Sequence, residues 1–418
     1  MGIDRQANDV ARLQQIKYRL PLVFTPSSPV NSASLFAGRE AEITQMIRAI
    51  GQPGRHVILF GARGVGKTSL AHIIYEIVNG VSPEVGYLAA RINCDAGDTF
   101  QSLWAKIAEE VDIQFEKLQA PIREESPAYP YLADLLAENA SPNVVRRFFG
   151  LIERAAIIVI DEFDRIQDEE LRGLIADTIK MLSDHAVSVT LIIVGVASDV
   201  DDLLYEHASI PRHIEEVLMP VMPVHELEEL VASRLKSVGM GIDDEALTLI
   251  ALLSQGLPPY AHLLGLYASL SAVNQARFTV GMSDLDAGLR ETMTQAAESV
   301  ASAYRQATMS NRPENLYEEV LLACALASCD ELGYFTPLEV RAPLRHILRR
   351  ADYDIPHFSH HLMKFVEHRG QVLQVAGTER QKRFRFSDPL LKPFVVVKGL
   401  DAGLVEAQDL LAWRVVNE

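Results

Sequence analysis

Eight consecutive residues decide the fold of this chain: Gly61-Ala62-Arg63-Gly64-Val65-Gly66-Lys67-Thr68. They follow an apolar run at 56–60 and precede a helical pattern that begins at Ser69. Strand, glycine-rich loop and helix is the context in which the pattern GxxxxGK[ST] binds a nucleotide. The glycines let backbone N–H groups converge on phosphate oxygens, and the new helix directs its positive end at them. Lys67 would then reach the β- and γ-phosphates, and the Thr68 hydroxyl would hold Mg²⁺.

Two carboxylates follow a second apolar run. Residues 155–160 are typical of a strand that is buried on both faces of a parallel sheet. Asp161 and Glu162 stand at its carboxyl end, where open α/β sheets bind ligands. We expect Asp161 to bind the Mg²⁺ shell, largely through water, and Glu162 to orient and deprotonate the attacking water. Asp164 on the following loop is either a surface acid or a helix cap.

Two later positions have both a functional and a structural interpretation. The buried strand 188–195 is followed by Ser198, which either contacts the γ-phosphate or the lytic water, or caps a helix. Arg212 precedes a further strand at 215–219. It is either a surface arginine or an arginine finger that reaches the phosphate of a neighbouring subunit.

The composition is that of a folded protein of two or three domains, with 48% hydrophobic and 23% charged residues among 418. The net charge is −17, but twelve Lys and Arg against five Asp and Glu give residues 341–400 a charge of +7, which leaves −24 elsewhere. A basic segment in an otherwise acidic chain indicates that this segment interacts with a binding partner. The three cysteines form no CxxC pair, which favours a reducing compartment. Without an h-region or an 18-residue apolar run, we expect a cytoplasmic protein and no membrane contact.

The chain outside these motifs predicts further domains. Residues 1–35 are weakly patterned, and their prolines at 21, 26 and 29 predict an extended N-terminal arm. Residues 117–142 predict an insertion with partial helix. From Val224 the spacing becomes helical, which predicts a separate lid domain at 223–308. Its expected helices lie at 227–235, 245–254, 261–271 and 283–307.

Residues 309–400 predict a winged-helix domain, followed by a tail at 401–418 with a terminal helix. Three helices are expected: one at 316–327, a second that begins at Pro337 after the cap Thr336, and a third at 357–367. Strands are expected at 372–375 and 384–386. The hairpin between these strands carries four basic residues: Arg380, Lys382, Arg383 and Arg385. The histidines of the third helix, at 357, 360 and 361, are either groove contacts or surface residues.

Together these motifs resemble AAA+ ATPases, in the branch shared by origin-recognition initiators, TnsC-type transposition regulators and the STAND signalling ATPases. Six segments carry the resemblance: 36–40, 61–68, 160–164, 195–198, 209–212 and 256–258. It implies an α/β fold with a P-loop parallel sheet core at 36–222, followed by an α-helical lid and a winged helix. It also implies ATP or ADP with Mg²⁺ as cofactors.

The resemblance also implies roles for single residues. Phe36, Gly38 and Arg39 would lie beside the adenine. The phosphate chain would contact the loop and the start of its helix, at Gly61, Gly64, Val65, Gly66, Lys67, Thr68 and Ser69. Ser198 falls where relatives place a sensor residue, often asparagine, so hydrolysis is expected to be slow. Pro258 lies in a match to the STAND Gly-x-Pro motif, and His262 takes the place of an arginine on the following helix.

Two classes of function follow. The first is an ATP-hydrolysing molecular switch of modest turnover that forms a homo-oligomer in the ATP state and contacts duplex DNA or a protein partner through its winged helix. The second is a STAND-like interaction component, for example in a defence system, in which ADP is locked and the winged helix contacts protein instead of DNA. The ADP content of the purified protein and its turnover distinguish the two.

Overall fold

The computed structural model describes residues 2–30, 32–117, 129–152, 154–197, 212–295, 298–310, 315–378 and 381–417. The chain divides into two compact units, and each is described by itself. The core unit consists of residues 29–62 and 66–219. The helical unit consists of residues 1–28, 63–65 and 220–418. No helix among the described residues is long and apolar enough to cross a lipid bilayer.

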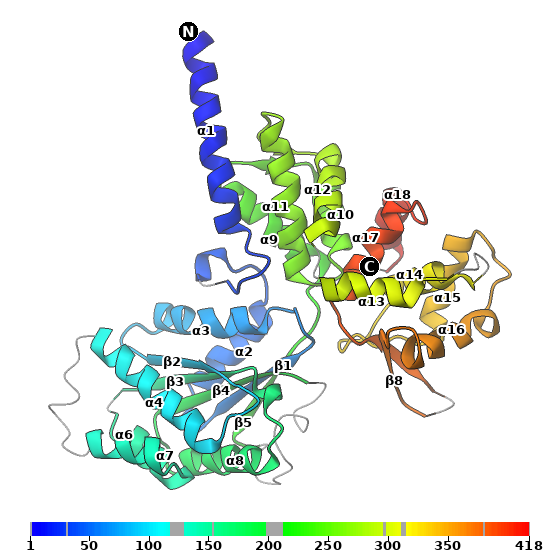
Figure 1. Cartoon of the computed structure of the whole chain (residues 1–418). Helices are drawn as coiled ribbons and strands as arrows, with labels where there is room; N and C mark the ends of the chain where they lie inside the picture. Colours follow the sequence, from blue (N-terminus) through cyan, green and yellow to red (C-terminus); the bar gives the residue numbers. More distant parts are fainter. Residues whose placement is uncertain are drawn as a thin grey trace. The chain divides into compact units, whose positions relative to one another are not determined.

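A five-stranded parallel sheet forms the centre of the core unit (Figure 1). The strand order is β2-β3-β4-β1-β5. The strands are β1 (His56–Gly61), β2 (Leu88–Asn93), β3 (Ala156–Asp161), β4 (Val189–Val196) and β5 (Ile214–Met219). β1 and β3 are buried along their whole length, because both faces of the sheet are covered. The predicted P-loop parallel sheet is therefore confirmed.

Helices cover both faces of this sheet. One face carries α2 (Glu40–Ile50) and α3 (Lys67–Val81). The other carries α4 (Phe100–Lys117), α7 (Pro142–Gly150) and α8 (Glu169–Asp184), with α6 (Tyr129–Glu138) packed on α4. Ile58, Ile158 and Ile193 share one buried cluster with residues of α4, α7 and α8. This packing holds the carboxyl ends of β1 and β3, and the loops that follow them, in fixed positions.

From Pro220 onward, the helical unit contains the predicted lid, the predicted winged-helix domain and the tail. Its first part has α9 (Val224–Ser237), α10 (Asp244–Leu253), α11 (Pro258–Asn274) and α12 (Met282–Gln295), with a short parallel pair β6 (Gly241–Ile242) and β7 (Thr279–Val280). Its second part has α13 (Glu298–Thr308), α14 (Tyr317–Leu326), α15 (Pro337–Leu348) and α16 (Ile355–Glu367), the antiparallel hairpin β8 (Leu373–Ala376) and β9 (Arg383–Phe386), then α17 (Leu391–Asp401) and α18 (Ala407–Asn417).

The two parts of the helical unit share packing. The buried helix α17 contacts both α12 and α14, and the Tyr260 hydroxyl of α11 donates a 2.8 Å hydrogen bond to the carbonyl of Leu390. The borders that the sequence predicts within this unit, at 308 and 400, remain predictions.

One expectation about secondary structure is wrong. The predicted extended arm contains α1 (Gly2–Val23), because Leu13, Ile16 and Leu20 recur at helical spacing and are buried. Pro21 falls within its last turn. The helix expected at 283–307 is described as α12 and α13, on either side of residues 296–297, which lie outside the described residues.

Candidate nucleotide-binding site

The glycine-rich loop leaves β1 through a backbone conformation that requires glycine. Gly61 has φ 142°, and a Cβ added there would lie 2.4 Å from the carbonyl oxygen of Met219 on the neighbouring strand β5. Gly66 has φ 102° and directly precedes α3, whose first residue is Lys67. The first turn of α3 therefore begins immediately after the loop, as a phosphate site requires.

Lys67 is a buried cation, with 7% of its surface exposed. Its Nζ donates hydrogen bonds to the carbonyl oxygens of Gly61 at 3.0 Å and Ala62 at 2.8 Å. Burial lowers the pKa of Lys67 to about 8, against the opposing charges of Asp164 and Asp161. The loop thus holds a partly desolvated ammonium group that gains strongly from an anion.

Asp161 ties the loop helix to the end of β3. Its carboxylate accepts a hydrogen bond from the Thr68 side chain and another, at 2.8 Å, from the backbone N–H of Glu162. Burial raises the pKa of Asp161, and these hydrogen bonds act in the opposite direction. A hydroxyl and a carboxylate side by side, next to a buried ammonium, are the oxygen ligands and the phosphate partner that a Mg²⁺–nucleotide site needs. The residues present therefore fit the implied cofactor.

Glu162 adopts a left-handed backbone conformation, with φ 57° and ψ 34°. This conformation costs a residue with a Cβ about 1–2 kcal/mol, and it sets the direction of the carboxylate. The side chain is about half exposed, and its Oε2 accepts a 2.7 Å hydrogen bond from Nη1 of Arg165. Arg165 also lies 3.9 Å from Asp95, which follows β2. Sequence reasoning missed Arg165; its position three residues after Glu162 was the available signal.

Asp164 positions the end of β4. Its Oδ1 accepts a 2.8 Å hydrogen bond from the backbone N–H of Val196, the last residue of that strand. The acid is thus a structural partner of the segment that leads to Ser198. Ser198 itself, and residues 209–211, lie outside the described residues.

The residues expected beside the adenine directly precede α2. Phe36 is partly buried, and Gly38 and Arg39 both have positive φ, at 70° and 65°. Arg39 is 1% exposed, and its Nη1 lies 3.4 Å from Glu42 in the first turn of α2. Their contact with a base remains a prediction.

Arg212 lies near the amino ends of the strands, whereas the glycine-rich loop follows the carboxyl end of β1. It precedes β5, whose Ile214 pairs with His56 at the start of β1, whereas Met219 pairs with Gly61 at its end. Arg212 and His213 form a turn before β5, and the five steps from Ile214 to Met219 span about 17 Å. The Arg212 side chain is 67% exposed and lies 3.7 Å from Asp184.

Pro258 and His262 belong to the helical unit. Pro258 starts α11, and His262, one turn later, is 4% exposed. Its Nδ1 accepts a 3.0 Å hydrogen bond from the backbone N–H of Thr25, and its ring packs edge-on against Phe24. Burial lowers the pKa of His262 to about 3, so the imidazole is neutral. The nucleotide contacts expected of both residues remain predictions.

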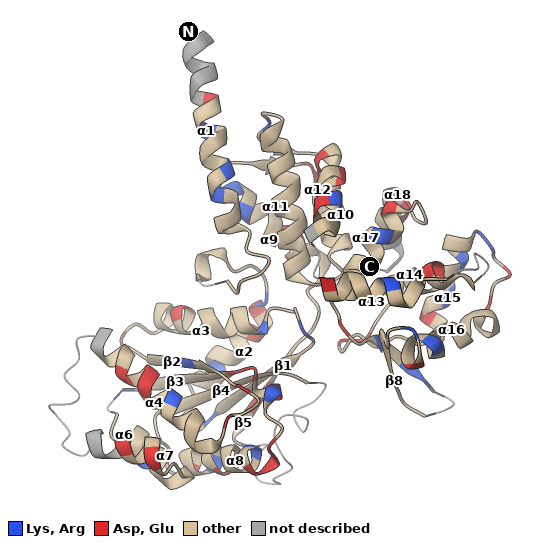
Figure 2. Ribbon diagram, in the orientation of Figure 1, with Lys and Arg blue, Asp and Glu red and all other residues tan. Residues whose placement is uncertain are grey.

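The basic hairpin is described except at Arg380. Lys382 packs against Met363 of α16, with its Nζ 3.7 Å from the sulfur. Arg383 and Arg385 place their guanidinium groups 4.9 and 4.7 Å from the ring centre of Tyr334. Figure 2 colours Lys and Arg blue, and blue segments lie beside the strand labelled β8. Arg383 also lies 3.4 Å from Asp330.

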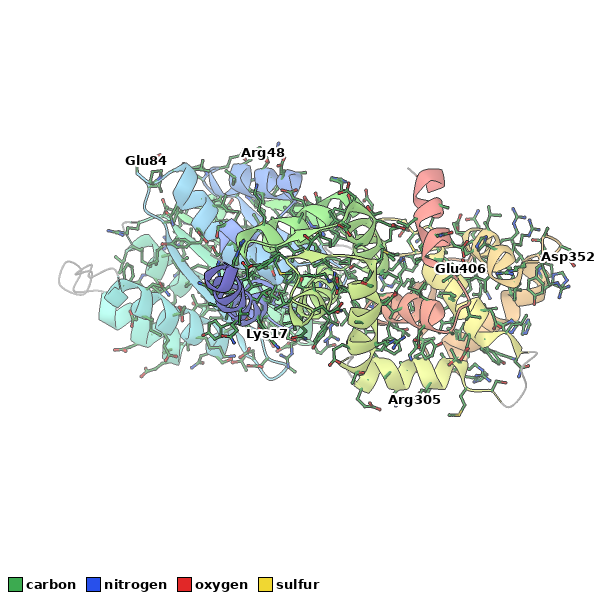
Figure 3. The ribbon with its side chains drawn as sticks, turned by 90° about the horizontal axis from the view of Figure 1, so that it is seen from above. Lys17, Arg48, Glu84, Arg305, Asp352 and Glu406 are labelled. Carbon is green, nitrogen blue, oxygen red and sulfur yellow. The ribbon has the colours of Figure 1, made fainter. Side chains whose placement is uncertain are left out.

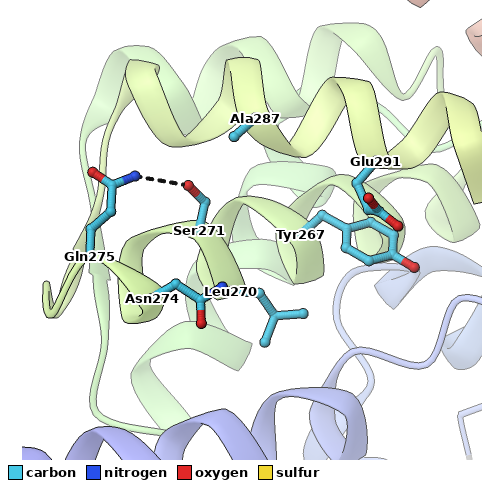
Figure 4. A pocket seen from close by; sticks show the side chains of 7 residues that line it. All are labelled: Tyr267, Leu270, Ser271, Asn274, Gln275, Ala287 and Glu291. Carbon is cyan, nitrogen blue, oxygen red and sulfur yellow. Dashed lines mark hydrogen bonds between the residues drawn. The ribbon is translucent and has the colours of Figure 1, made fainter.

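An open hollow of about 400 Å³ lies between α11 and α12 of the helical unit (Figure 4). Its walls are Tyr267, Leu270, Ser271, Asn274, Gln275, Ala287 and Glu291. The wall has no cation, and Glu291 would repel a phosphate chain. This hollow is therefore not a nucleotide site.

Comparison with known proteins agrees with this geometry. The family described as "AAA ATPase domain" matches residues 35–193. No curated protein matches the chain. Among solved structures, a Walker-type ATPase of Pyrococcus abyssi is 16% identical, covering 90% of this chain and 99% of that one, with a TM-score of 0.50. This likeness is one of fold.

The Aeropyrum pernix ORC2 protein, solved as ADPNP-ADP complexes, is 15% identical with a TM-score of 0.47, covering 91% of this chain and 97% of its own. The matched family spans the glycine-rich loop, the Asp161–Glu162 pair, three whole strands and the first part of β4. Residues 35–193 of this chain thus match the AAA ATPase domain family.

Proposed function

We propose that the protein is an ATP-dependent molecular switch that binds and slowly hydrolyses ATP. The observation that carries this proposal is the contact between Thr68 and Asp161 beside the buried Lys67, inside an AAA ATPase domain. Lys67 donates to carbonyls of Gly61 and Ala62, and Thr68 donates to Asp161. Each of these groups is of the type that a phosphate chain or a divalent cation attracts.

The chain's own residues supply binding and proton transfer. Lys67 and the first turn of α3 hold the phosphates, and Thr68 with Asp161 holds the cation. Mg²⁺, when bound, neutralises charge that develops on the phosphate oxygens. Glu162 orients the attacking water and accepts its proton through the oxygen that Arg165 does not engage. Because Arg165 occupies Oε2, turnover is expected to be slow.

The test is the Glu162→Gln variant. We expect ATP affinity close to that of the wild-type protein and a fall in turnover of about 10²–10⁴-fold, the usual cost of removing a general base. Glu170→Gln changes an exposed acid at the start of α8 and is the matched control. Turnover at the wild-type level in Glu162→Gln would refute the catalytic assignment.

Arg212 supports an assembly of several subunits. It precedes a strand of about 17 Å whose far end lies at the carboxyl end of its own sheet, too far to touch the nucleotide of its own subunit. We infer that it acts as a finger on a neighbouring subunit in the ATP state. The mass in solution, with ADP and with a non-hydrolysable ATP analogue, tests this. Arg212→Ala should retain nucleotide binding but lose the turnover that depends on protein concentration; a monomer that hydrolyses ATP at the wild-type rate would exclude a finger.

The second part of the helical unit has the element order of a winged helix, α14, α15, α16 and the hairpin β8–β9. We propose that this hairpin contacts the phosphates of duplex DNA through Arg380, Lys382, Arg383 and Arg385. The charge of +7 over residues 341–400, against −24 elsewhere, supports an anionic ligand for this segment.

Salt dependence separates a DNA contact from a protein contact. If the hairpin neutralises four phosphates, raising the salt concentration from 50 to 200 mM should weaken DNA binding about a hundredfold. Fluorescence anisotropy with a labelled duplex, with and without the four charges, measures this slope. No DNA binding at 50 mM salt would favour the protein-contact interpretation of the same hairpin.

The alternative is a component that keeps ADP bound. Tightly co-purifying ADP together with negligible turnover in the wild-type protein would favour it over the switch. ADP that exchanges within seconds would exclude it.

A further inference from the structure

The end of α1 is anchored in the helical unit by a buried cation and a buried ring. Arg234 of α9 is 1% exposed, and its Nε donates a 3.0 Å hydrogen bond to the carbonyl of Val23, the last residue of α1. The next residue, Phe24, is 1% exposed. A Cβ at Gly265 of α11 would lie 2.6 Å from the Phe24 ring, so the glycine makes room for it. The backbone up to Thr25 is therefore fixed on α9 and α11.

Shortly afterwards the same segment is anchored in the core unit, on the helix that follows the glycine-rich loop. The backbone N–H of Val30 donates a 3.1 Å hydrogen bond to the hydroxyl of Ser69, which is next to Thr68. The backbone N–H of Ala33 donates a 2.8 Å hydrogen bond to Glu76, two turns further along α3. The core anchor thus sits on the first turns of the phosphate-binding helix.

The connection between these anchors is short. From Thr25 to Val30 there are five Cα–Cα steps, and fully extended chain spans at most about 18 Å over that length. Pro26 and Pro29 reduce its freedom further. This limit follows from the covalent chain and holds for any arrangement of the two units.

A later passage of the chain between the units follows β5. Met219 pairs with Gly61 at the end of β5, and Pro220 is the first residue of the helical unit. Three residues after Met219, the backbone N–H of Met222 donates a 2.8 Å hydrogen bond to the carbonyl of Gly256, just before α11. Both chain passages are thus anchored within a few residues on each side.

We propose that residues 26–29 are a strap that limits how far the helical unit separates from the phosphate-binding helix, and that the strap slows release of the bound nucleotide. This proposal rests on the proposed nucleotide binding.

The test lengthens the strap without touching either anchor. Five residues of Gly and Ser inserted between Ser27 and Ser28 double the connection from five Cα–Cα steps to ten. Doubling a flexible connection changes its closure free energy by about 0.6 kcal/mol, which is about threefold. We therefore expect a fluorescent ATP analogue to dissociate about threefold faster. The same insertion after Gly403, in an exposed turn between α17 and α18, is the control and should change nothing.

A second readout needs no nucleotide. Spin labels at Tyr18, which is 76% exposed on α1, and at Glu84, which Figure 3 labels on the core unit, report the distance between the units. Cys329, which is partly exposed, is replaced by serine in this background, and the other two cysteines are buried. The strap insertion should broaden the distance distribution, and the Gly403 insertion should not.

The outcomes separate the two proposals. A wild-type protein that does not bind the analogue defeats the proposed function, while the distance distribution still decides whether the strap limits separation. An insertion that changes neither the dissociation rate nor the distribution overturns the strap. Phe24→Ala, which frees the anchor at the other end, should reproduce the insertion, and hydrogen exchange at Thr25 reports that release.

Discussion

Two buried cations, Lys67 and Arg234, both donate hydrogen bonds to backbone carbonyls, but we assign ligand binding to the first and stability to the second. Each donates to backbone carbonyls, Lys67 to those of Gly61 and Ala62, and Arg234 to those of Val23 and Leu230. Lys67 has Asp161 and Asp164 within electrostatic reach, whereas burial alone shifts the pKa of Arg234, to about 10. Arg234 therefore stabilises the contact between α9 and the end of α1, whereas Lys67 is available to bind an anionic ligand.

The difference follows from whether each cation can exchange its carbonyl partner for a ligand. The carbonyls around Lys67 belong to Gly61 and Ala62 at the end of β1, so its ammonium can turn to phosphate by rotation of its own side chain, without unfolding an element. The Val23 carbonyl lies at the end of α1, where a helix leaves its last carbonyls without internal partners. Arg234 satisfies one of them, and its guanidinium is always charged.

Removing Lys67 tests the comparison most strongly. Lys67→Ala should lower ATP affinity at least about a hundredfold, since hydrogen bonds to charged groups contribute about 1.5–3 kcal/mol each. Its thermal unfolding should be close to that of the wild type, because a costly buried charge is removed as well. Calorimetric titration with ATP measures the affinity, and Lys180→Ala, an exposed lysine on α8, is the control. A large loss of stability with intact affinity would reverse the roles assigned to the two cations.

Removing Arg234 should give the opposite pattern. Arg234→Met leaves the Val23 carbonyl without its donor, which costs about 1–3 kcal/mol of stability. We expect lower thermal stability, faster hydrogen exchange in α1, and ATP affinity reduced no more than about threefold. Arg290→Met changes an exposed arginine on α12 and should have no effect on any of these. Equal loss of affinity in Arg234→Met and Lys67→Ala would show that the two sites are not separable.

The pH dependence sharpens the same contrast. The pKa of Lys67 is about 8 in the folded protein and 10.5 when exposed, so between these values the unfolded chain holds the extra proton. Stability should therefore rise with pH in this window, by about 1 kcal/mol per pH unit. ATP affinity should fall over the same window, up to about tenfold per unit, because the neutral amine no longer attracts phosphate. Titrations at pH 7–9.5 check both, and Lys67→Ala should flatten both profiles.

The sequence predicted the sheet and the phosphate site because both depend on local patterns. The run at 155–160 is apolar throughout since β3 is buried on both faces, and the loop at 61–68 needs glycines whatever surrounds it. The Thr336 cap was found for the same reason, and the structure places a capping box there.

What the sequence did not predict depends on distant partners. The hydrogen bond between His262 Nδ1 and the backbone of Thr25, 237 positions away, is one such contact, and the nucleotide contact of His262 stays a prediction. In α1, the prolines at 21, 26 and 29 favour an extended arm, but the apolar spacing of Leu13, Ile16 and Leu20 prevails because these side chains are buried. A contact between segments so far apart leaves no periodicity in either one.

A third cation, Arg165, gives the smallest expected effect, because it is half exposed where Lys67 and Arg234 are buried. Exposed ion pairs contribute about 0.2–1 kcal/mol, so Arg165→Ala should change turnover by no more than about fivefold. We expect an increase, since the carboxylate of Glu162 is then free to face the attacking water, with the KM for ATP unchanged. Arg165→Lys keeps the charge and should lie between the two. A fall in turnover on Arg165→Ala, with KM unchanged, would mean that Arg165 holds Glu162 in its working position instead of away from it.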